Sequence, residues 1–278
     1  MKVYSPSQTT SWLECPLKRQ YQQLGYRKRE VDKRIVSAAI GTVLHHAFDV
    51  FNTTGSLTQA ENALTEIIEA TPLGPVFSWL DYELPLRKVL QKLAKDVPWE
   101  LYGWHTCGGS IRLGEEYGNC EFDHVIASGE TKTFNDFKTS WEKKDHWQIK
   151  FWQEIKDSWQ MAHYVWAWEQ CHQTQLDKFG ITLVVCTPKP KVEFREIPVN
   201  RTLVERFTKS APVHWARMQM DEFMYQTVPS YRSAVTDQHH GRYGECEFYD
   251  ACFLYNGDYE LMQVGYEKIE RRRDASQE

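Results

Sequence analysis

Hydrophobic residues recur at helical spacing over long stretches near both ends of the chain. Leu44, Phe48 and Phe51 form an apolar stripe within residues 38–52, which is the pattern of a helix that packs by one face. Pro16 is expected near the start of an N-terminal helix, because proline fits the first helical turn. The same spacing predicts further helices at residues 58–70, 81–101, 152–172 and 201–226.

Strand-like alternation is concentrated in the middle of the chain. Residues 120–126 and 131–138 flank the turn Ser128-Gly129-Glu130, and they predict a β-hairpin. Residues 111–117, 181–186 and 192–199 predict three more strands. Helices first, strands in the middle and helix again indicate a mixed α/β fold with a small central sheet flanked by helices.

The hairpin carries two acids and a lysine. Side chains two residues apart in a strand share a face, so Asp136 and Lys138 point the same way, and the hairpin can bring Asp123 beside them. Two carboxylates and an ammonium group can hold a hard divalent cation and stabilise an anionic transition state. A surface ion pair on an ordinary hairpin is the alternative interpretation.

The overall charge argues against a general polyanion binder. The 278 residues carry a formal net charge of −5, so any nucleic-acid surface must come from local basic clusters. One such cluster is Lys18 to Arg34, with seven basic residues against two acids; it is either a solvated face or a phosphate-contacting patch. The candidates for DNA contact are Lys18, Arg19, Arg27, Lys28 and Arg29.

Membrane and export signals are not evident in the sequence. No apolar run approaches the roughly 18–20 residues of a membrane span, and the N-terminal MKVYSPSQTT lacks the apolar core of a signal peptide. We therefore expect a cytoplasmic protein. In that compartment the seven cysteines are expected to be buried thiols or metal ligands rather than a disulfide framework.

Residues 238–252 contain a second candidate for metal chemistry. Cys246 and Cys252 follow His239 and His240 within a short stretch, and such ligands suit zinc or an iron–sulfur cluster. The spacing is not that of an ordinary zinc finger, and unrelated buried thiols are the alternative.

Taken together, these segments resemble the PD-(D/E)xK nuclease superfamily, in particular the RecB-type branch with an iron–sulfur staple. That branch includes the CRISPR adaptation exonucleases and many phage-encoded exonucleases. The matching segments occur in family order. They are SPSQTTSWLECPLKRQY, GTVLH, EFD, DFKT, QMAHY and CEFYDAC, which span about Ser5 to Cys252.

The resemblance implies a restriction-endonuclease-like core and a role for each matching residue. His45, Asp123, Asp136 and the main-chain carbonyl of Phe137 would bind Mg²⁺ or Mn²⁺. Lys138 would position or activate the attacking water. The last two catalytic candidates, Gln160 and Tyr164, would support the site and touch the DNA backbone.

The resemblance also implies a metal staple that joins the chain's two ends. Relatives with a 4Fe–4S cluster use four cysteines, whereas here only Cys15, Cys246 and Cys252 occupy such places. His240 lies near the position of the fourth, with His239 as its substitute. A histidine can replace cysteine in some iron–sulfur sites, a Cys3His set also suits Zn²⁺, and a metal-free site is the third alternative.

These expectations combine into one interpretation. We expect a single nuclease domain over residues 1–256, with a helical N-terminal part (about 5–105), a catalytic core (about 106–226), a metal-staple segment (227–256) and a tail (257–278). The predicted activity is metal-dependent DNA hydrolysis, by an exonuclease acting on single strands or duplex ends in recombination, repair or replication, with proteins of those processes as partners. A structure-specific endonuclease and a non-cutting nucleic-acid-binding subunit are the alternatives. If phage-encoded, the protein would work in the cytoplasm of a bacterial host.

Overall fold

The computed structural model divides into two compact units, and each is described by itself. Unit 1 comprises Met1–Glu30, Arg112–Gly118 and Lys209–Glu278, and unit 2 comprises Val31–Ile111 and Asn119–Thr208. The structure describes residues 4–28, 33–71, 78–96, 102–103, 111–113, 116–118, 124–128, 131–140, 145–187, 189–228, 240–241, 244–245, 248, 251–252, 262 and 266–268.

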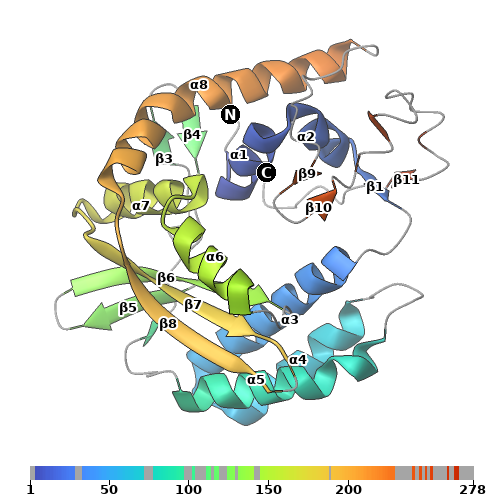
Figure 1. Ribbon diagram of the computed structural model, residues 1–278, viewed down its shortest axis with the longest axis vertical. Coiled ribbons are helices and arrows are strands. Elements are labelled where there is room, and N and C mark those ends of the chain that lie inside the picture. Colours follow the sequence, from blue (N-terminus) through green and yellow to red (C-terminus); the bar gives the residue numbers. More distant parts are fainter. Residues whose placement is uncertain are drawn as a thin grey trace. The chain divides into compact units, whose positions relative to one another are not determined.

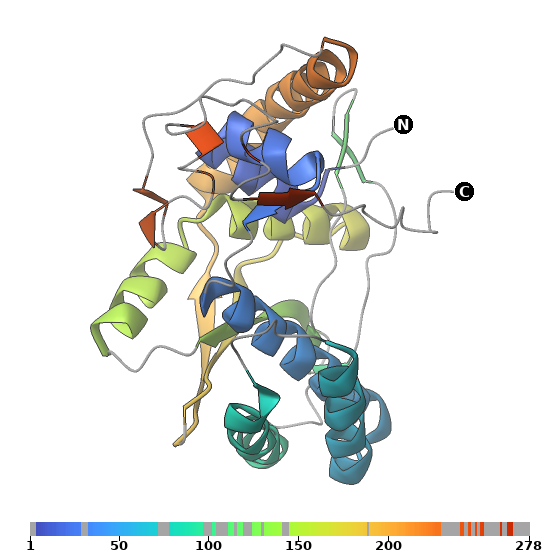
Figure 2. The same ribbon diagram turned by 90° about the vertical axis from the view of Figure 1, so that its right-hand side faces the viewer.

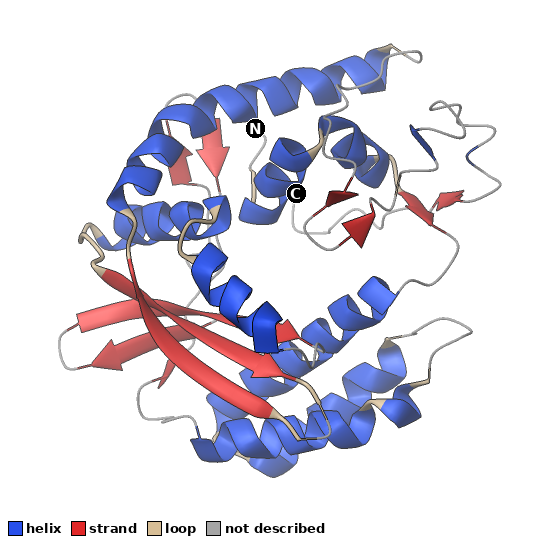
Figure 3. Cartoon of the chain, viewed as in Figure 1, coloured by secondary structure: helices blue, strands red, loops and turns tan. Residues whose placement is uncertain are grey.

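Unit 2 contains a mixed sheet with helices on both faces (Figures 1 and 3). This confirms the predicted α/β fold class. Its elements are α3 (Lys33–Thr54), α4 (Leu57–Ala70), η1 (Trp79–Asp81), α5 (Glu83–Asp96), β2 (Tyr102–Gly103), β5 (His124–Ser128), β6 (Thr131–Ser140), α6 (Asp145–Ile155), α7 (Trp159–His172), β7 (Lys178–Val185) and β8 (Lys191–Pro198).

The five strands lie in the order β2-β5-β6-β7-β8. Strands β5 and β6 form the predicted hairpin, in which Ser128 pairs with Thr131 across a two-residue loop. Strand β7 pairs parallel to β6 and antiparallel to β8. The parallel pair requires a crossover, and α6 and α7 supply it along the chain.

The two faces of this sheet are covered by different helices. Helices α3, α4 and α5 pack against one another and enclose an apolar cluster that includes Phe48, Leu64 and Leu90 together with Phe137 of β6 and Val184 of β7. Helix α6 lies on the other side of β7 and β8, as Figure 2 shows. Because both faces are covered, β7 is buried along nearly its whole length, as expected for a strand at the centre of a layered fold.

The predicted long helix over residues 152–172 is wrong, because the chain forms two helices there. Helix α6 begins earlier, at Asp145, and ends at Ile155. Helix α7 then starts after Ser158, whose side chain accepts a hydrogen bond from the Met161 amide. A serine that accepts a hydrogen bond from such an N–H is a common helix start. Aromatic residues continue on both sides of Ser158, so the hydrophobic pattern alone did not reveal the break.

Unit 1 brings together segments from both ends of the chain. Its elements are α1 (Pro6–Glu14), α2 (Pro16–Gln23), β1 (Tyr26–Lys28), β3 (Ile111–Leu113, which begins at the boundary), β4 (Glu116–Gly118), β9 (His240–Gly241), β10 (Gly244–Glu245) and β11 (Tyr266–Lys268). Helix α8 (Arg201–Thr227) starts in unit 2 and ends in unit 1.

Short pairings hold these segments. Strand β1 pairs antiparallel with β11, so part of the expected tail is ordered against the N-terminal region. The single strand predicted at 111–117 is instead two strands, β3 and β4, paired with each other. Pro16 is the first residue of α2, as predicted, and α1 is a further helix capped by Ser5 and Gln8.

The buried His163 of α7 makes the fold sensitive to acid. Burial lowers its pKa from 6.5 to about 3, so between these values the unfolded chain binds a proton that the folded chain does not. Stability should therefore fall as the pH drops through this window, by up to about 1.4 kcal/mol per pH unit. His163→Leu should reduce the pH dependence of the free energy of unfolding, measured by urea unfolding from pH 7.5 to 4. His46→Leu, which replaces an exposed imidazole, is the control; an unchanged slope in His163→Leu would contradict this account.

Candidate active site

An ion pair occupies the centre of the candidate site. The Nζ atom of Lys138 lies 2.7 Å from Oδ2 of Asp136, and the two side chains are 26% and 4% exposed. Both residues belong to β6, two positions apart, so they share a face of the sheet. A nearly enclosed carboxylate is costly unless an opposite charge accompanies it, and the partly exposed Lys138 supplies that charge.

Phe137, between them on β6, points toward the opposite face of the sheet. The ring of Phe137 lies 4.9 Å, centroid to centroid, from both His45 and Phe48 of α3. Strand alternation therefore directs Phe137 into the α3–α5 core and the pair Asp136 and Lys138 toward the face that carries α6 and α7. His45 is thus placed beside the site strand, in contact with the predicted carbonyl ligand Phe137.

Helix α3 approaches β6 closely just before His45. A Cβ atom at Gly41 would lie 3.0 Å from Oγ1 of Thr139, which is shorter than an ordinary contact between such atoms. Glycine therefore lets the helix come near the end of the DFKT segment. His45 follows one turn later on the same helix and contacts Phe137 of β6.

Gln160 and Tyr164 lie on the helix that covers the ion-pair face. The amide Nε2 of Gln160 donates to the hydroxyl of Tyr164 at 3.2 Å. The Tyr164 ring is 5.9 Å from the ring of Phe134, and Phe134 alternates onto the same face of β6 as Asp136. The structure therefore brings Asp136, Lys138, Gln160 and Tyr164 to one side of the sheet.

Several predicted site residues lie outside the described part of the chain. These are Asp123, Arg29, His239 and Cys246, and only the backbone is described for Arg27, Lys28 and His240. Within the described residues, no three His, Cys, Asp or Glu side chains are grouped as a metal site. The predicted metal site includes the side chains of His45, Asp123 and Asp136, and Asp123 lies outside the described residues.

Of the predicted basic contacts, the two with described side chains are both engaged within unit 1. Lys18 Nζ lies 3.2 Å from Oε2 of Glu14. Arg19 is only 8% exposed and lines a small hollow with Asp221 and Glu222 of α8. Little of this side chain is therefore open to a phosphate group, and two acidic residues border the same hollow.

Two of the proposed staple cysteines share one apolar cluster. Cys15 is buried there with Leu17 and Tyr21, together with Phe248 and other residues of the C-terminal segment, and Cys252 packs against the same cluster. The Cys15 sulfur also accepts a hydrogen bond from the Lys18 amide at 3.5 Å. Segments far apart in sequence therefore meet at these thiols.

Two described cysteines outside the proposed staple differ in exposure. Cys171 is exposed and Cys186 is buried. Cys186 is fully buried at the end of β7, and this burial raises its pKa to about 12. A thiol that stays protonated to such a pH is an inert core residue.

One buried polar residue of the site strand escaped the sequence analysis. Asn135 is fully buried beside Asp136, and its Oδ1 accepts a hydrogen bond from Thr182 of β7 at 3.1 Å. This bond ties the site strand to its parallel neighbour within the interior. A polar residue amid the apolar positions of a strand was the available signal.

The fold and the ion pair define a class of nuclease. The chain belongs to the PD-(D/E)XK nuclease superfamily, whose family model matches residues 3–253. This membership implies metal-dependent hydrolysis of nucleic-acid phosphodiester bonds, typically with Mg²⁺ or Mn²⁺. The predicted superfamily is thus confirmed.

Other comparisons add little. No curated protein matches the chain. One similar solved structure is described as the crystal structure of SSO0001; the match has 14% identity and a TM-score of 0.26, and covers 69% of this chain and 77% of that one. No candidate membrane-spanning helix occurs among the described residues.

The close approach at Gly41 yields a stability prediction. Gly41→Val should push α3 away from Thr139 and lower the free energy of unfolding by about 1–3 kcal/mol, the usual cost of overpacking. His46→Val places the same β-branched residue at an exposed position of α3 and controls for helix propensity. Equal melting temperatures for the two variants would show that the helix and strand are not in tight contact.

Proposed function

We propose that this protein is a metal-dependent deoxyribonuclease, and that it acts as an exonuclease on single strands or duplex ends. The observation that carries the proposal is the Asp136–Lys138 ion pair on one face of β6, in a chain of the PD-(D/E)XK nuclease superfamily. The acid would bind the metal ion. The ammonium group would orient the attacking water and balance the charge that develops on the phosphate.

The proposed donor atoms have the chemistry that a hard or borderline divalent cation requires. In the proposal, His45, Asp123, Asp136 and the Phe137 carbonyl hold Mg²⁺ or Mn²⁺. Carboxylate and carbonyl oxygens suit Mg²⁺, and an imidazole makes Mn²⁺ a good alternative. The bound ion would polarise the phosphoryl oxygen and lower the pKa of the attacking water.

The register of the hairpin supports the inclusion of Asp123. His124 pairs with Asn135, and the next residues of β5, from Val125 to Ser128, pair in the same antiparallel register with Phe134 to Thr131. One more step along this register would set Asp123 opposite Asp136, on the same face. We therefore propose the two acids as the metal-binding pair.

The preference for DNA ends comes from the resemblance to RecB-type exonucleases. A structure-specific endonuclease would use the same residues, and a non-cutting subunit would not need the charge pair beside a metal site. End-labelled single-stranded, duplex and hairpin DNA, each incubated with Mg²⁺ or Mn²⁺, tests all three. Stepwise shortening from an end supports the exonuclease, internal products support the endonuclease, and intact DNA with both metals would overturn the proposal.

Asp136→Asn should abolish hydrolysis without unfolding the protein. Losing a metal-ligating carboxylate should lower the rate at least about a hundredfold, because several kcal/mol of transition-state stabilisation disappear. The measurement is single-turnover cleavage of labelled DNA by a variant whose melting curve shows a folded protein. Cleavage at a near wild-type rate would show that the site has been assigned wrongly.

Lys138→Met should also stop cleavage, but at a cost in stability that Asp136→Asn avoids. It leaves a carboxylate that is 4% exposed without its counter-charge, at a cost of about 3 kcal/mol. The matched control is Lys178→Met, which breaks an exposed pair with Glu196 at the same 2.7 Å separation and should cost less than about 1 kcal/mol. Equal losses of unfolding free energy in Lys138→Met and Lys178→Met would contradict the argument that burial of Asp136 makes its counter-charge important.

We further propose that Cys15, Cys246, Cys252 and His240 hold a 4Fe–4S cluster, with Zn²⁺ as the alternative metal. The meeting of Cys15 and Cys252 in one apolar cluster supports this staple. Protein partners in recombination, repair or replication remain part of the same proposal. Lys18, Arg27, Lys28 and Arg29 are proposed as backbone contacts, and Tyr164 as an additional one.

Cys15→Ser should lower stability first and activity only as a consequence. A link that closes most of the chain restricts the unfolded state, by about 5 kcal/mol in the disulfide analogue. Anaerobically purified protein should be brown and contain iron; a colourless protein with stoichiometric zinc would indicate the Zn²⁺ form. Cys171→Ser, at an exposed thiol, is the control. Absence of both metals together with an unchanged melting temperature in Cys15→Ser would overturn the staple.

A further inference from the structure

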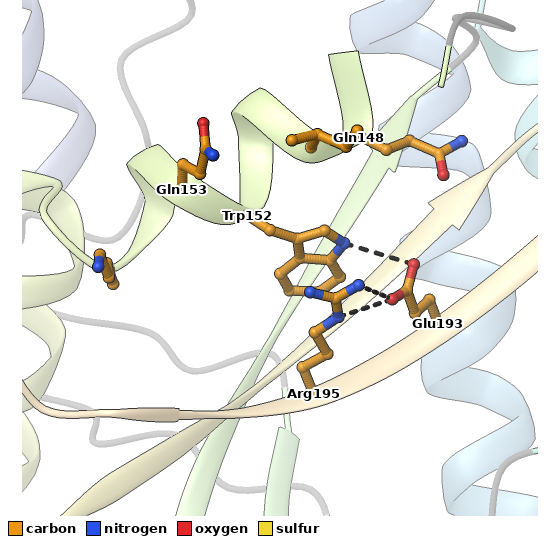
Figure 4. Close-up of a pocket in the computed structure, with 7 residues that line it drawn as sticks. Gln148, Trp152, Gln153, Glu193 and Arg195 are labelled. Carbon is orange, nitrogen blue, oxygen red and sulfur yellow. Dashed lines mark hydrogen bonds and ion pairs between the residues drawn. The ribbon is translucent and has the colours of Figure 1, made fainter. Parts of the chain in front are cut away.

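A hollow on unit 2 presents a layered group of aromatic and charged side chains (Figure 4). Its volume is about 510 Å³. It is lined by Gln148, Ile149, Trp152 and Gln153 of α6, by Lys156 just after that helix, and by Glu193 and Arg195 of β8. This volume lies within the range of small-ligand sites. None of these residues belongs to the nuclease site proposed above.

Arg195 is held over the Trp152 ring in this hollow. Its guanidinium carbon lies 4.5 Å from the centre of the Trp152 ring, and its Nε donates to Oε1 of Glu193 at 2.6 Å. The indole N–H of Trp152 donates to the other carboxylate oxygen of Glu193 at 3.4 Å. The three side chains thus fix one another's orientation before any ligand arrives.

The two stacked side chains differ in exposure. Trp152 is 8% exposed, whereas the Arg195 side chain is 49% exposed. Trp152 therefore lies beneath a guanidinium group that is half open to solvent, and both residues line the hollow. The Glu193 carboxylate already neutralises the guanidinium charge, which disfavours a phosphate as the ligand. A flat, uncharged ring suits this surface, because guanidinium planes stack on nucleobases.

The sheet register relates the hollow to the candidate active site. Asp136 pairs with Ile181, and Ile181 pairs with Arg195; paired residues share a face of the sheet. Arg195 therefore lies on the same face as Asp136, two strands away, at roughly 10 Å from the strand spacing. Lys138 and Glu193 are related in the same way through Leu183.

We propose that Arg195, supported by Trp152 and Glu193, is a stacking platform for one unpaired nucleobase of the DNA strand whose backbone lies at Asp136 and Lys138. The proposal rests on the nuclease function proposed above and adds a substrate requirement. A base in a duplex is stacked on its neighbours, so the platform takes a base from a single strand or a frayed end. Gln148 and Gln153 line the hollow with amides that can hydrogen-bond to base edges.

The test measures base-dependent binding without hydrolysis. Hairpin DNA with a short 5′ or 3′ overhang fixes the register, and each overhang base is removed in turn to leave an abasic sugar. Binding is measured by fluorescence anisotropy without divalent metal. With wild-type protein, we expect affinity to fall roughly 5- to 150-fold when the base at one or two adjacent positions is missing, the range for stacking one base, and to change little elsewhere.

Two variants separate stacking from charge. Arg195→Ala and Arg195→Lys should both flatten the abasic profile, since lysine keeps the charge but has no plane. Arg201→Lys is the matched control, because Arg201 also pairs with a glutamate, Glu169, at 2.6 Å outside the hollow. It should keep the wild-type profile. A profile retained in Arg195→Lys would show a charge contact and overturn the platform, as would a wild-type profile with no sensitive position.

The outcomes also distinguish this inference from the nuclease function. If the protein cleaves DNA but shows no abasic-sensitive position, the platform is wrong and the nuclease function stands. If abasic sensitivity depends on Arg195 but no metal supports cleavage, the platform stands as part of a DNA-binding protein and the nuclease function is wrong. A thermal melt of each variant confirms folding, which the half-exposed position of Arg195 makes the expected result.

Discussion

A carboxylate inside a strand that is covered on both faces must have an opposite charge next to it. Asp136 meets this condition through Lys138, at 2.7 Å. The two-residue period of a strand then requires the intervening residue to point the other way. Phe137 does so and packs against Phe48 and His45 of α3. Three consecutive residues thus build a charge pair on one face and an apolar anchor on the other, and the helices on both sides follow from that division.

Local patterns predicted much of this arrangement. The hairpin of β5 and β6 follows from alternation on either side of a glycine-containing turn, and β7 and β8 follow from β-branched runs around a proline-containing turn. That Asp136 and Lys138 share a face needs only the strand period. The parallel pairing of β6 with β7 was not predictable in this way, because it depends on how far α6 and α7 carry the chain. The break at Ser158 was missed because aromatic residues continue on both sides of it.

Charge was a weaker guide than periodicity. The basic run after Pro16 predicts a DNA-contacting surface, whereas Arg19 is only 8% exposed and lines a hollow with Asp221 and Glu222. Composition cannot distinguish a buried arginine from one that faces solvent, since both are the same residue in the sequence. The acids that enclose Arg19 lie on α8, some two hundred residues away in the sequence. Similarly, Trp152, Glu193 and Arg195 carry no motif, because they meet only through the β7–β8 register and the placement of α6.

The same register explains how binding away from the reacting bond can assist hydrolysis. A phosphate near Lys138 must be aligned with the attacking water, and interactions remote from the bond can supply the energy for that alignment. Arg195 is joined to Asp136 through hydrogen-bonded strands, by way of the buried Ile181. A base held on the guanidinium plane would therefore be fixed relative to the charge pair by the sheet itself. Hydrogen-bonded strands hold positions more precisely than loops do, so in this proposal the buried strand β7 would be the rigid spacer between a base contact and a phosphate contact.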